Sequence, residues 1–172
     1  MNVDRVFSNH SRLVYVLTSY PDGNPTYFVP NKGNLFDAMK ASSALPIVYG
    51  AIKVGEHQYI DGALSIYLPI EKAIADGYEE VLVVHNKPPA SSNGQSSNLL
   101  WLMLPKSIRS LLKTRNDRLQ TLEEKFFNDS RVRFIRPQSP LSLTSNLDTN
   151  KARLNKAIDL GICDAKEFLG IS

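Results

Sequence analysis

The sequence predicts an α/β fold, and three observations lead to this prediction. Residues 58–60 and 81–84 carry side chains typical of strands, and a helical segment opened by Pro69 and closed by Gly77 separates them. Residues 81–84 (VLVV) are continuously apolar, as expected of a strand buried on both faces of a parallel sheet. A strand, a helix and a strand in this order form a βαβ unit, so we expect a mixed, mainly parallel sheet.

The residues before this unit predict a hairpin and a short helix. The expected hairpin consists of a strand over residues 12–20, a turn over 21–25 and a strand over 26–29. A helix over residues 35–42, an extended segment over 47–54 and a turn over 55–57 are expected to follow. Asn34 is the expected N-cap of the helix, which has to stop before Pro46.

The residues after the βαβ unit predict a loop, two helices and one more strand. Residues 87–98 are rich in Pro, Ser, Asn and Gly, which indicates a mobile surface loop. Apolar residues at helical spacing predict an amphipathic helix over 107–127, and a strand follows at 132–135. A final helix is expected to be capped by Asp148 and broken or bent at Gly161.

The composition is that of a folded domain, and it excludes several function classes. Hydrophobic residues make up 42% and charged residues 22% of the 172 residues, and the net charge of +3 is too small to indicate nucleic-acid binding. The single cysteine, Cys163, has no neighbours at metal-ligand spacing, and no cofactor is expected. Residues 1–10 contain no apolar signal core, so a cytoplasmic location is expected.

Two motifs in a fixed order resemble the patatin-like phospholipases. Residues 41–46 (ASSALP) are followed by residues 59–63 (YIDGA), and that family pairs an ASxALP segment with a DGG or DGA motif a short way downstream. Residues 68–77 continue the resemblance, and residues 134–137 with the final helices are similar to the bacterial branch of the family. The resemblance covers nearly the whole chain, and the ordered set is specific although DGA alone is weak.

The resemblance implies a catalytic role for Asp61. In that family a serine in G-x-S-x-G attacks the ester, and the aspartate of the DG[GA] motif contacts the serine directly, with no histidine between them. Asp61 is therefore the expected general base, with Gly62 and Ala63 completing its motif. A serine hydroxyl is a weak nucleophile that needs an adjacent base, and a carboxylate with a tuned pKa can fill that role. Gly62 would let the backbone turn sharply after the carboxylate.

The serine itself is absent from the sequence. G-x-S-x-G occurs nowhere, and residues 94–98 (GQSSN) lack the second glycine and lie in a polar segment. No glycine-rich oxyanion segment occurs either; in a complete family member both would precede residue 1. The chain by itself is therefore expected to be inactive, with an exposed sheet edge that favours self-association or binding of an N-terminal partner fragment.

The implied fold is a three-layer α/β/α sandwich without its N-terminal strands. Residues 1–86 would be the C-terminal part of a patatin-like catalytic domain, residues 87–98 a flexible loop, and residues 99–172 a helical and strand region packed on the same domain. The implied function is part of a lipid acyl hydrolase that cleaves carboxylic esters of phospholipids or related acyl esters. The alternative is a non-catalytic remnant, or a module that binds lipid or a partner.

Several candidate residues also have simpler explanations. Asp61 followed by Gly62 is a common turn signal, which the flanking motifs outweigh. Ser42 and Ser43 have no nucleophile-elbow context and are expected to end the short helix, with a supporting role near Asp61 as the functional alternative. All three histidines are expected to be non-catalytic: His10, His57 and His85.

The apolar run over residues 99–104 (LLWLML) has two explanations. It precedes a basic helix, so Trp101 and Leu102 are candidates for a peripheral membrane contact, at the inner membrane surface for a cytoplasmic protein. It is also far shorter than the roughly 20 residues that span a bilayer. Such stripes are more often core, and we favour core packing.

Overall fold

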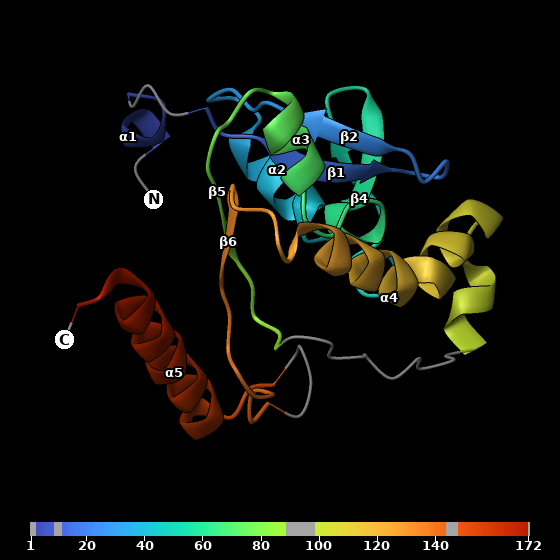
Figure 1. The fold of residues 1–172 in the computed structure, drawn as a ribbon. Helices are drawn as coiled ribbons and strands as arrows, with labels where there is room; N and C mark the ends of the chain where they lie inside the picture. Colours follow the sequence, from blue (N-terminus) through green and yellow to red (C-terminus); the bar gives the residue numbers. More distant parts are fainter. Residues whose placement is uncertain (1–2, 9–11, 89–98, 144–147, 172) are drawn as a thin grey trace. The chain divides into compact units, whose positions relative to one another are not determined.

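The computed structural model describes residues 3–8, 12–88, 99–143 and 148–171, and these residues fall into two compact units (Figure 1). The first unit comprises Met1–Pro69 and Gly94–Leu119, and the second comprises Ile70–Asn93 and Gln120–Ser172. Each unit contains both helices and strands, so the expected α/β class is confirmed at that level. The domain limits expected from the sequence stay a prediction.

The first unit is built on a four-stranded antiparallel sheet in the order β2-β1-β4-β3. Its strands are β1 (Tyr15–Ser19), β2 (Pro25–Phe28), β3 (Ile52–Val54) and β4 (His57–Asp61). Two of its pairings, β1 with β2 and β3 with β4, are hairpins, and their short connections permit only antiparallel pairing. The sheet therefore differs from the mainly parallel sheet that the sequence predicts.

Helix α2 (Leu35–Ser42) packs against this sheet and has the limits predicted from the sequence. Its buried residues, Leu35, Ala38 and Ala41, recur at helical spacing. Ala41 joins Leu17 of β1 in a core cluster with Val54 and Tyr59. Asn34 is the N-cap residue, as predicted, but its side-chain oxygen accepts a hydrogen bond from the N–H of Asn31 and none from the helix.

The extended segment expected over residues 47–54 is only partly present. Strand β3 begins at Ile52, whereas the N–H groups of Val48 and Tyr49 both donate to the carbonyl oxygen of Leu45. This local turn satisfies backbone groups that an extended chain would leave to a neighbouring strand.

Helix α4 (Lys106–Phe126) agrees with the predicted helix to within one residue at each end. In the first unit Ile108 of α4 lies fully buried in a cluster with Ile60 of β4 and Leu64. The short 3₁₀ helices η1 (Gly62–Leu64) and η2 (Leu99–Met103) also belong to this unit, as does α1 (Val3–Phe7).

The second unit contains a pair of parallel strands. The sequence predicted each strand but not their pairing with each other. Strands β5 (Val81–Val84) and β6 (Val132–Ile135) pair in parallel, and helix α3 (Ile70–Ala75) contacts β5. The predicted βαβ unit over residues 58–85 is wrong, because β4 pairs with β1 and β3 in the antiparallel sheet whereas β5 pairs with β6. Pairing partners are chosen by long-range contacts, which a local pattern of apolar residues does not specify.

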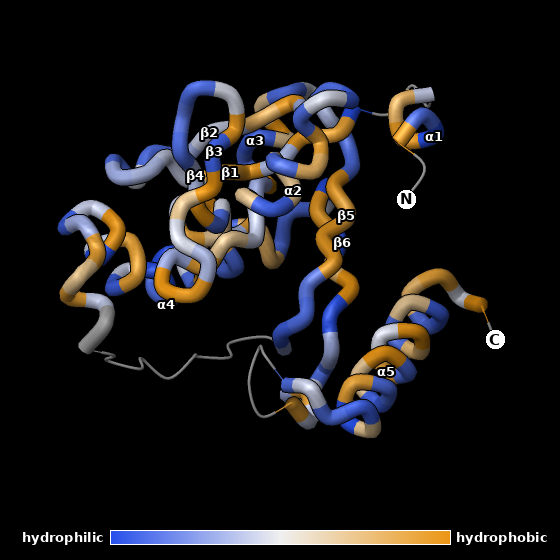
Figure 2. The backbone as a smooth tube through the Cα atoms, turned by 180° about the vertical axis from the view of Figure 1, so that it is seen from behind, coloured by the Kyte–Doolittle hydropathy of each residue, from blue (hydrophilic) through white to orange (hydrophobic). Residues whose placement is uncertain are grey.

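Strand β5 is covered on one face only. Val83 is buried, but Leu82 and Val84 are 49% and 73% exposed. The prediction of burial on both faces is therefore wrong for the described chain. Figure 2 shows the resulting apolar stretch along β5 and β6.

Helix α5 (Lys151–Leu169) runs unbroken through Gly161, contrary to expectation. A glycine costs a helix interior about 1 kcal/mol, which is too little to break a helix of this length. Its N-cap is Asn150, whose side chain accepts a hydrogen bond from the N–H of Arg153, and not Asp148 as predicted. Asp148 instead accepts a hydrogen bond from the N–H of Asn150 and forms an ion pair with Arg153.

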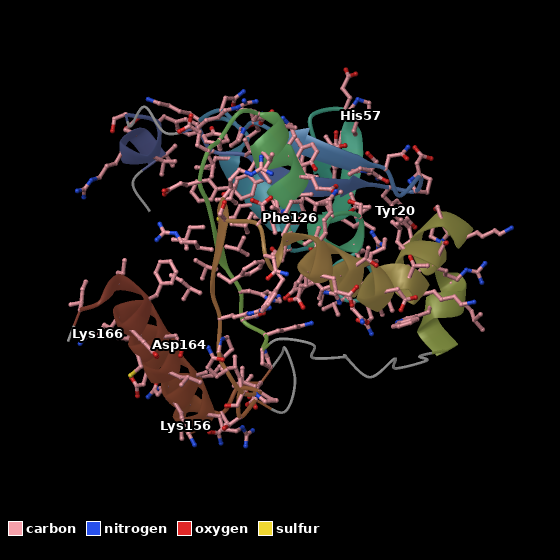
Figure 3. The ribbon with its side chains drawn as sticks, in the orientation of Figure 1. Tyr20, His57, Phe126, Lys156, Asp164 and Lys166 are labelled. Atoms are coloured by element: carbon pink, nitrogen blue, oxygen red, sulfur yellow. The ribbon has the colours of Figure 1, made fainter. Side chains whose placement is uncertain are left out.

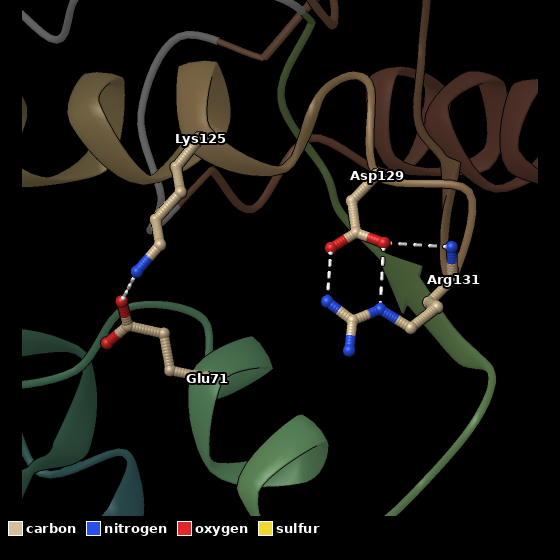
Figure 4. Close-up of polar contacts among 4 residues, drawn as sticks. All are labelled: Glu71, Lys125, Asp129 and Arg131. Atoms are coloured by element: carbon tan, nitrogen blue, oxygen red, sulfur yellow. Dashed lines mark hydrogen bonds and ion pairs between the residues drawn. The ribbon is translucent and has the colours of Figure 1, made fainter.

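Figure 4 shows two polar contacts in the second unit, one between α3 and the end of α4 and one in the turn before β6. Glu71 of α3 pairs with Lys125 of α4 at 2.6 Å. Asp129 accepts hydrogen bonds from the backbone N–H and the guanidinium of Arg131, and these bonds lower the pKa of its carboxyl to about 2. Of the expected loop over residues 87–98, residues 89–98 lie outside the described residues.

Candidate functional site

Asp61 lies where strand β4 passes directly into the 3₁₀ helix η1. It is the last residue of β4 and the N-cap of η1, and its Oδ1 accepts a hydrogen bond of 2.9 Å from the N–H of Ala63. The side chain is half-buried, so one carboxylate oxygen is fixed by the turn that follows it. The DGA motif thus forms a compact cap, with Ala63 supplying the backbone donor.

Gly62 is required by a close approach of two backbone segments. A Cβ at this position would lie 1.9 Å from the carbonyl oxygen of Val16 and 2.4 Å from its carbonyl carbon. These are backbone atoms of β1 that cannot move aside like a flexible side chain. The sequence predicted the glycine for a sharp turn, but its positional reason is contact with the neighbouring strand.

Two buried hydroxyl groups attach the same turn to β1. The Oγ1 atom of Thr18 donates to the carbonyl oxygen of Asp61 at 2.8 Å and lies 2.8 Å from the Oγ atom of Ser65. The Ser65 hydroxyl is also within 3.3 Å of the carbonyl oxygen of Gly62. Both residues are buried, so these bonds satisfy polar groups that would otherwise be costly.

Arg118 of α4 holds the opposite end of the turn. Its guanidinium donates to the carbonyl oxygens of Leu64 and Ser65, both at 2.6 Å, and to that of Leu111 at 3.0 Å. Burial, with a smaller contribution from the positive charge of Arg115, lowers the pKa of Arg118. A planar guanidinium can bridge several carbonyl oxygens in this way, which an ammonium cannot do with the same geometry.

Arg115 supplies the charge that acts on the Asp61 carboxylate. Its guanidinium lies over the ring of Tyr67, 4.9 Å from the ring centre, and its Nε atom is buried without a hydrogen bond among the described residues. Burial raises the pKa of Asp61, and the Ala63 N–H and the charge of Arg115 oppose the rise without cancelling it. A carboxyl with a raised pKa is a better proton acceptor than an ordinary aspartate.

The ASSALP segment meets Asp61 through the backbone. The N–H of Asp61 donates to the carbonyl oxygen of Ala44 at 3.0 Å, so the two motifs of the sequence analysis are hydrogen-bonded to each other. Ser42 is the last residue of α2, and Ser43 is its C-cap, with a hydroxyl that donates to the carbonyl oxygen of Met39 at 3.1 Å. Both serines therefore end the helix, as expected.

The histidines lie apart from this turn. His57, labelled in Figure 3, is exposed at the start of β4, with its ring centre 6.3 Å from that of Tyr59. His85 follows β5 in the second unit, where it is buried with its Nδ1 3.8 Å from the Glu123 carboxylate. Burial, with the positive charges of Lys87 and Arg136, lowers the pKa of His85 to about 4. His10 lies outside the described residues.

The two membrane-contact candidates lie on η2, next to the start of α4. Trp101 is half-buried, whereas Leu102 is 64% exposed. None of the helices in the described ranges is long and apolar enough to cross a membrane. Within the same ranges, no group of three or more His, Cys, Asp or Glu side chains is placed to hold a metal ion.

Comparison with known proteins finds a family model that matches the segment containing the Asp61 turn. The family model described as Patatin-like phospholipase matches residues 3–74, which contain the turn and all four strands of the antiparallel sheet. Over residues 3–74 the chain is therefore similar to the patatin-like phospholipases. The resemblance seen in the sequence motifs is confirmed for this segment.

The chain is also similar to a bacterial protein. It is 29% identical over 85 residues to the protein named Uncharacterized protein YjjU, from Escherichia coli (strain K12). The alignment covers 49% of this chain and 24% of YjjU, so it spans about a quarter of that relative's length.

Three residues that build the Asp61 turn were not predicted from the sequence: Thr18, Ser65 and Arg118. Thr18 and Ser65 carry no motif signal, because serine and threonine occur in strands and turns for many reasons. Arg118 did leave a signal. It lies in helical phase with the apolar residues Ile108 and Leu111, so a guanidinium on the buried face of α4 could have been inferred from spacing alone.

Proposed function

We propose that this patatin-like chain supplies the general base of a Ser-Asp dyad in a lipid acyl hydrolase. The observation that carries the proposal is the environment of the Asp61 side chain. The side chain is half-buried, its carboxylate accepts a hydrogen bond from the Ala63 N–H, and burial raises its pKa. Burial with a specific charge partner is typical of functional carboxylates. The substrate would be a carboxylic ester of a phospholipid or a related acyl ester.

The proposed reaction proceeds through a covalent acyl-serine. The Asp61 carboxylate accepts the serine hydroxyl proton while the serine oxygen attacks the ester carbonyl carbon. Collapse of the tetrahedral intermediate breaks the ester bond, and the proton passes from Asp61 to the departing alcohol. Water then attacks the acyl-serine while Asp61 accepts a proton from it. Breaking of the bond between the acyl carbon and the serine oxygen releases the fatty acid, and the proton returns from Asp61 to the serine oxygen.

The serine in this proposal comes from another polypeptide segment, since the sequence contains no G-x-S-x-G. Such a segment would also bring the oxyanion donors and the strands that complete a three-layer sandwich with a mainly parallel sheet. Two features support this extension. Strands β5 and β6 already pair in parallel, and Leu82 and Val84 leave an apolar face of β5 open for further packing.

The remaining motif residues would support Asp61 in the proposed site. Gly62 lets the turn approach β1, and Ala63 holds one carboxylate oxygen in place. Ser42 and Ser43 would keep the end of α2 in position, so that the carbonyl oxygen of Ala44 can accept from the Asp61 N–H.

Partners and location follow from the same proposal. Besides the lipid substrate, the chain would bind an N-terminal fragment that carries the serine, or a second copy of itself, through the exposed apolar face of β5. A cytoplasmic location with access to the inner membrane surface fits a lipid substrate. A non-catalytic module that binds lipid or a partner is the competing function, favoured by the lack of a nucleophile motif in the chain.

Complementation tests the proposal against the competing function. The chain is mixed with a separately expressed N-terminal fragment of a patatin-like phospholipase that carries G-x-S-x-G, and serine reactivity is followed with a fluorophosphonate probe. We expect labelling of the fragment only in the presence of the chain, with Asp61→Asn reducing the rate by at least about 100-fold. Complex formation without any labelling would favour the binding module.

A further inference from the structure

The surface at η2 exposes two neighbouring apolar side chains. Leu102 is 64% exposed and Met103 is 82% exposed, so the core packing that the sequence analysis favoured is wrong for these two residues. The next residue, Leu104, packs against the cluster of Ile60, Leu64 and Ile108. Of residues 102–104, one therefore anchors the segment and two are exposed.

The segment that presents these side chains is firmly attached to the first unit. Ile108, in the first turn of α4, is fully buried, and Leu111 contacts the same cluster. The hydroxyl of Ser107 donates to the carbonyl oxygen of Pro21 at 2.5 Å. Leu102 and Met103 thus precede an anchored helix start.

The start of helix α4 is basic. Residues 99–116 contain four basic residues, Lys106, Arg109, Lys113 and Arg115, and no acidic residue. Lys106, Arg109 and Lys113 recur at the helical spacing i, i+3, i+7, so they share one face of α4. Lys106 and Lys113 are exposed, and Arg109 is partly exposed.

We propose that η2 and the first two turns of α4 form a contact for an anionic lipid surface. Leu102 and Met103 would enter the boundary between headgroups and acyl chains, while Lys106, Arg109 and Lys113 would bind headgroup phosphates. Charge complementarity favours this occupant, because apolar side chains beside the basic first two turns of α4 match anionic lipid. The proposal goes beyond the hydrolase function and does not depend on it.

Trp101 provides a site-specific probe, because it is the only tryptophan in the chain and lies within η2. The full chain is titrated with vesicles of phosphatidylcholine alone, or of phosphatidylcholine with phosphatidylglycerol. We expect a blue shift of Trp101 emission and co-sedimentation only with the anionic vesicles, both weakened by added salt. Unchanged emission and no co-sedimentation with anionic vesicles would overturn the proposal.

Paired variants separate this surface from general adsorption. Two double variants should each weaken partitioning into anionic vesicles at least about tenfold: Leu102→Ser with Met103→Ser, and Lys106→Glu with Lys113→Glu. Each basic residue near an anionic surface raises the partition coefficient by roughly a factor of five. The matched controls are Val48→Ser with Tyr49→Ser, at 55% and 66% exposure, and Lys151→Glu with Lys156→Glu on α5. The controls should bind like the wild type.

Two results from these variants would overturn the proposal. Equal losses in the test and control variants would mean that the chain adsorbs without a defined surface. A change of oligomeric state in sedimentation velocity for Leu102→Ser with Met103→Ser, with unchanged vesicle binding, would show that this surface binds another protein chain.

Discussion

Gly62 and Val16 approach so closely that a Cβ on the glycine would lie 1.9 Å from the valine carbonyl oxygen. This contact presses the turn after Asp61 against strand β1. Hydrogen bonds from the Thr18 hydroxyl and the Arg118 guanidinium, together with the Ser65 hydroxyl, hold the same turn. The orientation of the Asp61 carboxylate is thus determined by both local and distant parts of the first unit.

Gly62→Ala should strongly destabilise the chain, because the added methyl group meets backbone atoms of Val16. We expect a loss of about 3 kcal/mol or more in the free energy of unfolding, measured by urea denaturation. Gly161→Ala is the matched control, since a Cβ there meets nothing within 4 Å and the residue lies inside α5. The control should gain about 0.5–1 kcal/mol. Equal effects at the two glycines would contradict the close approach.

Arg118→Lys should lose most of the stabilisation that the guanidinium provides to the turn. A lysine retains the charge but cannot bridge the carbonyl oxygens of Leu64, Ser65 and Leu111. We expect a loss of about 2 kcal/mol in unfolding free energy, close to that of Arg118→Ala. A lysine variant as stable as the wild type would show that charge alone is sufficient. Lys113→Ala, on the exposed face of α4, serves as the control and should be nearly neutral.

The sequence predicted elements whose signal is local. Helix α2, helix α4 and strand β6 have the predicted limits to within one residue, because periodicity and flanking residues specify them. It failed on pairing, since nothing local tells β4 to pair with β1 or β5 to pair with β6. The site divides in the same way: Asp61 was found from its motif, whereas Arg118 reaches Ser65 across 53 residues.

His85 should make stability fall as the pH decreases from about 6.5 to 4. The pKa of His85 is about 4 in the folded chain, whereas the unfolded chain has the ordinary value of 6.5. The unfolded chain therefore binds the proton more tightly. The stability from the neutral imidazole is fully present above pH 6.5 and is lost progressively below it, by about 2 kcal/mol at pH 5. Urea denaturation at pH 7.5 and pH 5 checks this. His85→Gln should lack this part of the pH dependence, and an identical slope in the variant would contradict the account.

Asp61→Asn should stabilise the chain at pH 7. Burial raises the carboxyl pKa in the folded state, so folding favours the protonated form and stability falls as the pH rises through that pKa. Asparagine keeps an oxygen that can accept from the Ala63 N–H and removes the buried charge. Chemical denaturation at pH 7 measures the effect. A stability at pH 7 equal to or below that of the wild type would contradict a carboxylate that burial disfavours, because asparagine is as good a cap as aspartate.

The central claim is that the surroundings of Asp61 make it a proton acceptor, and the direct measurement is the pKa of its carboxyl by carbon-detected NMR titration of the full chain. The account predicts a value above the ordinary 3.8, because burial outweighs the Ala63 N–H and the charge of Arg115. It also predicts a further rise in Arg115→Gln, since that substitution removes the opposing charge. A pKa at or below 3.8, or one that Arg115→Gln leaves unchanged, would contradict the account.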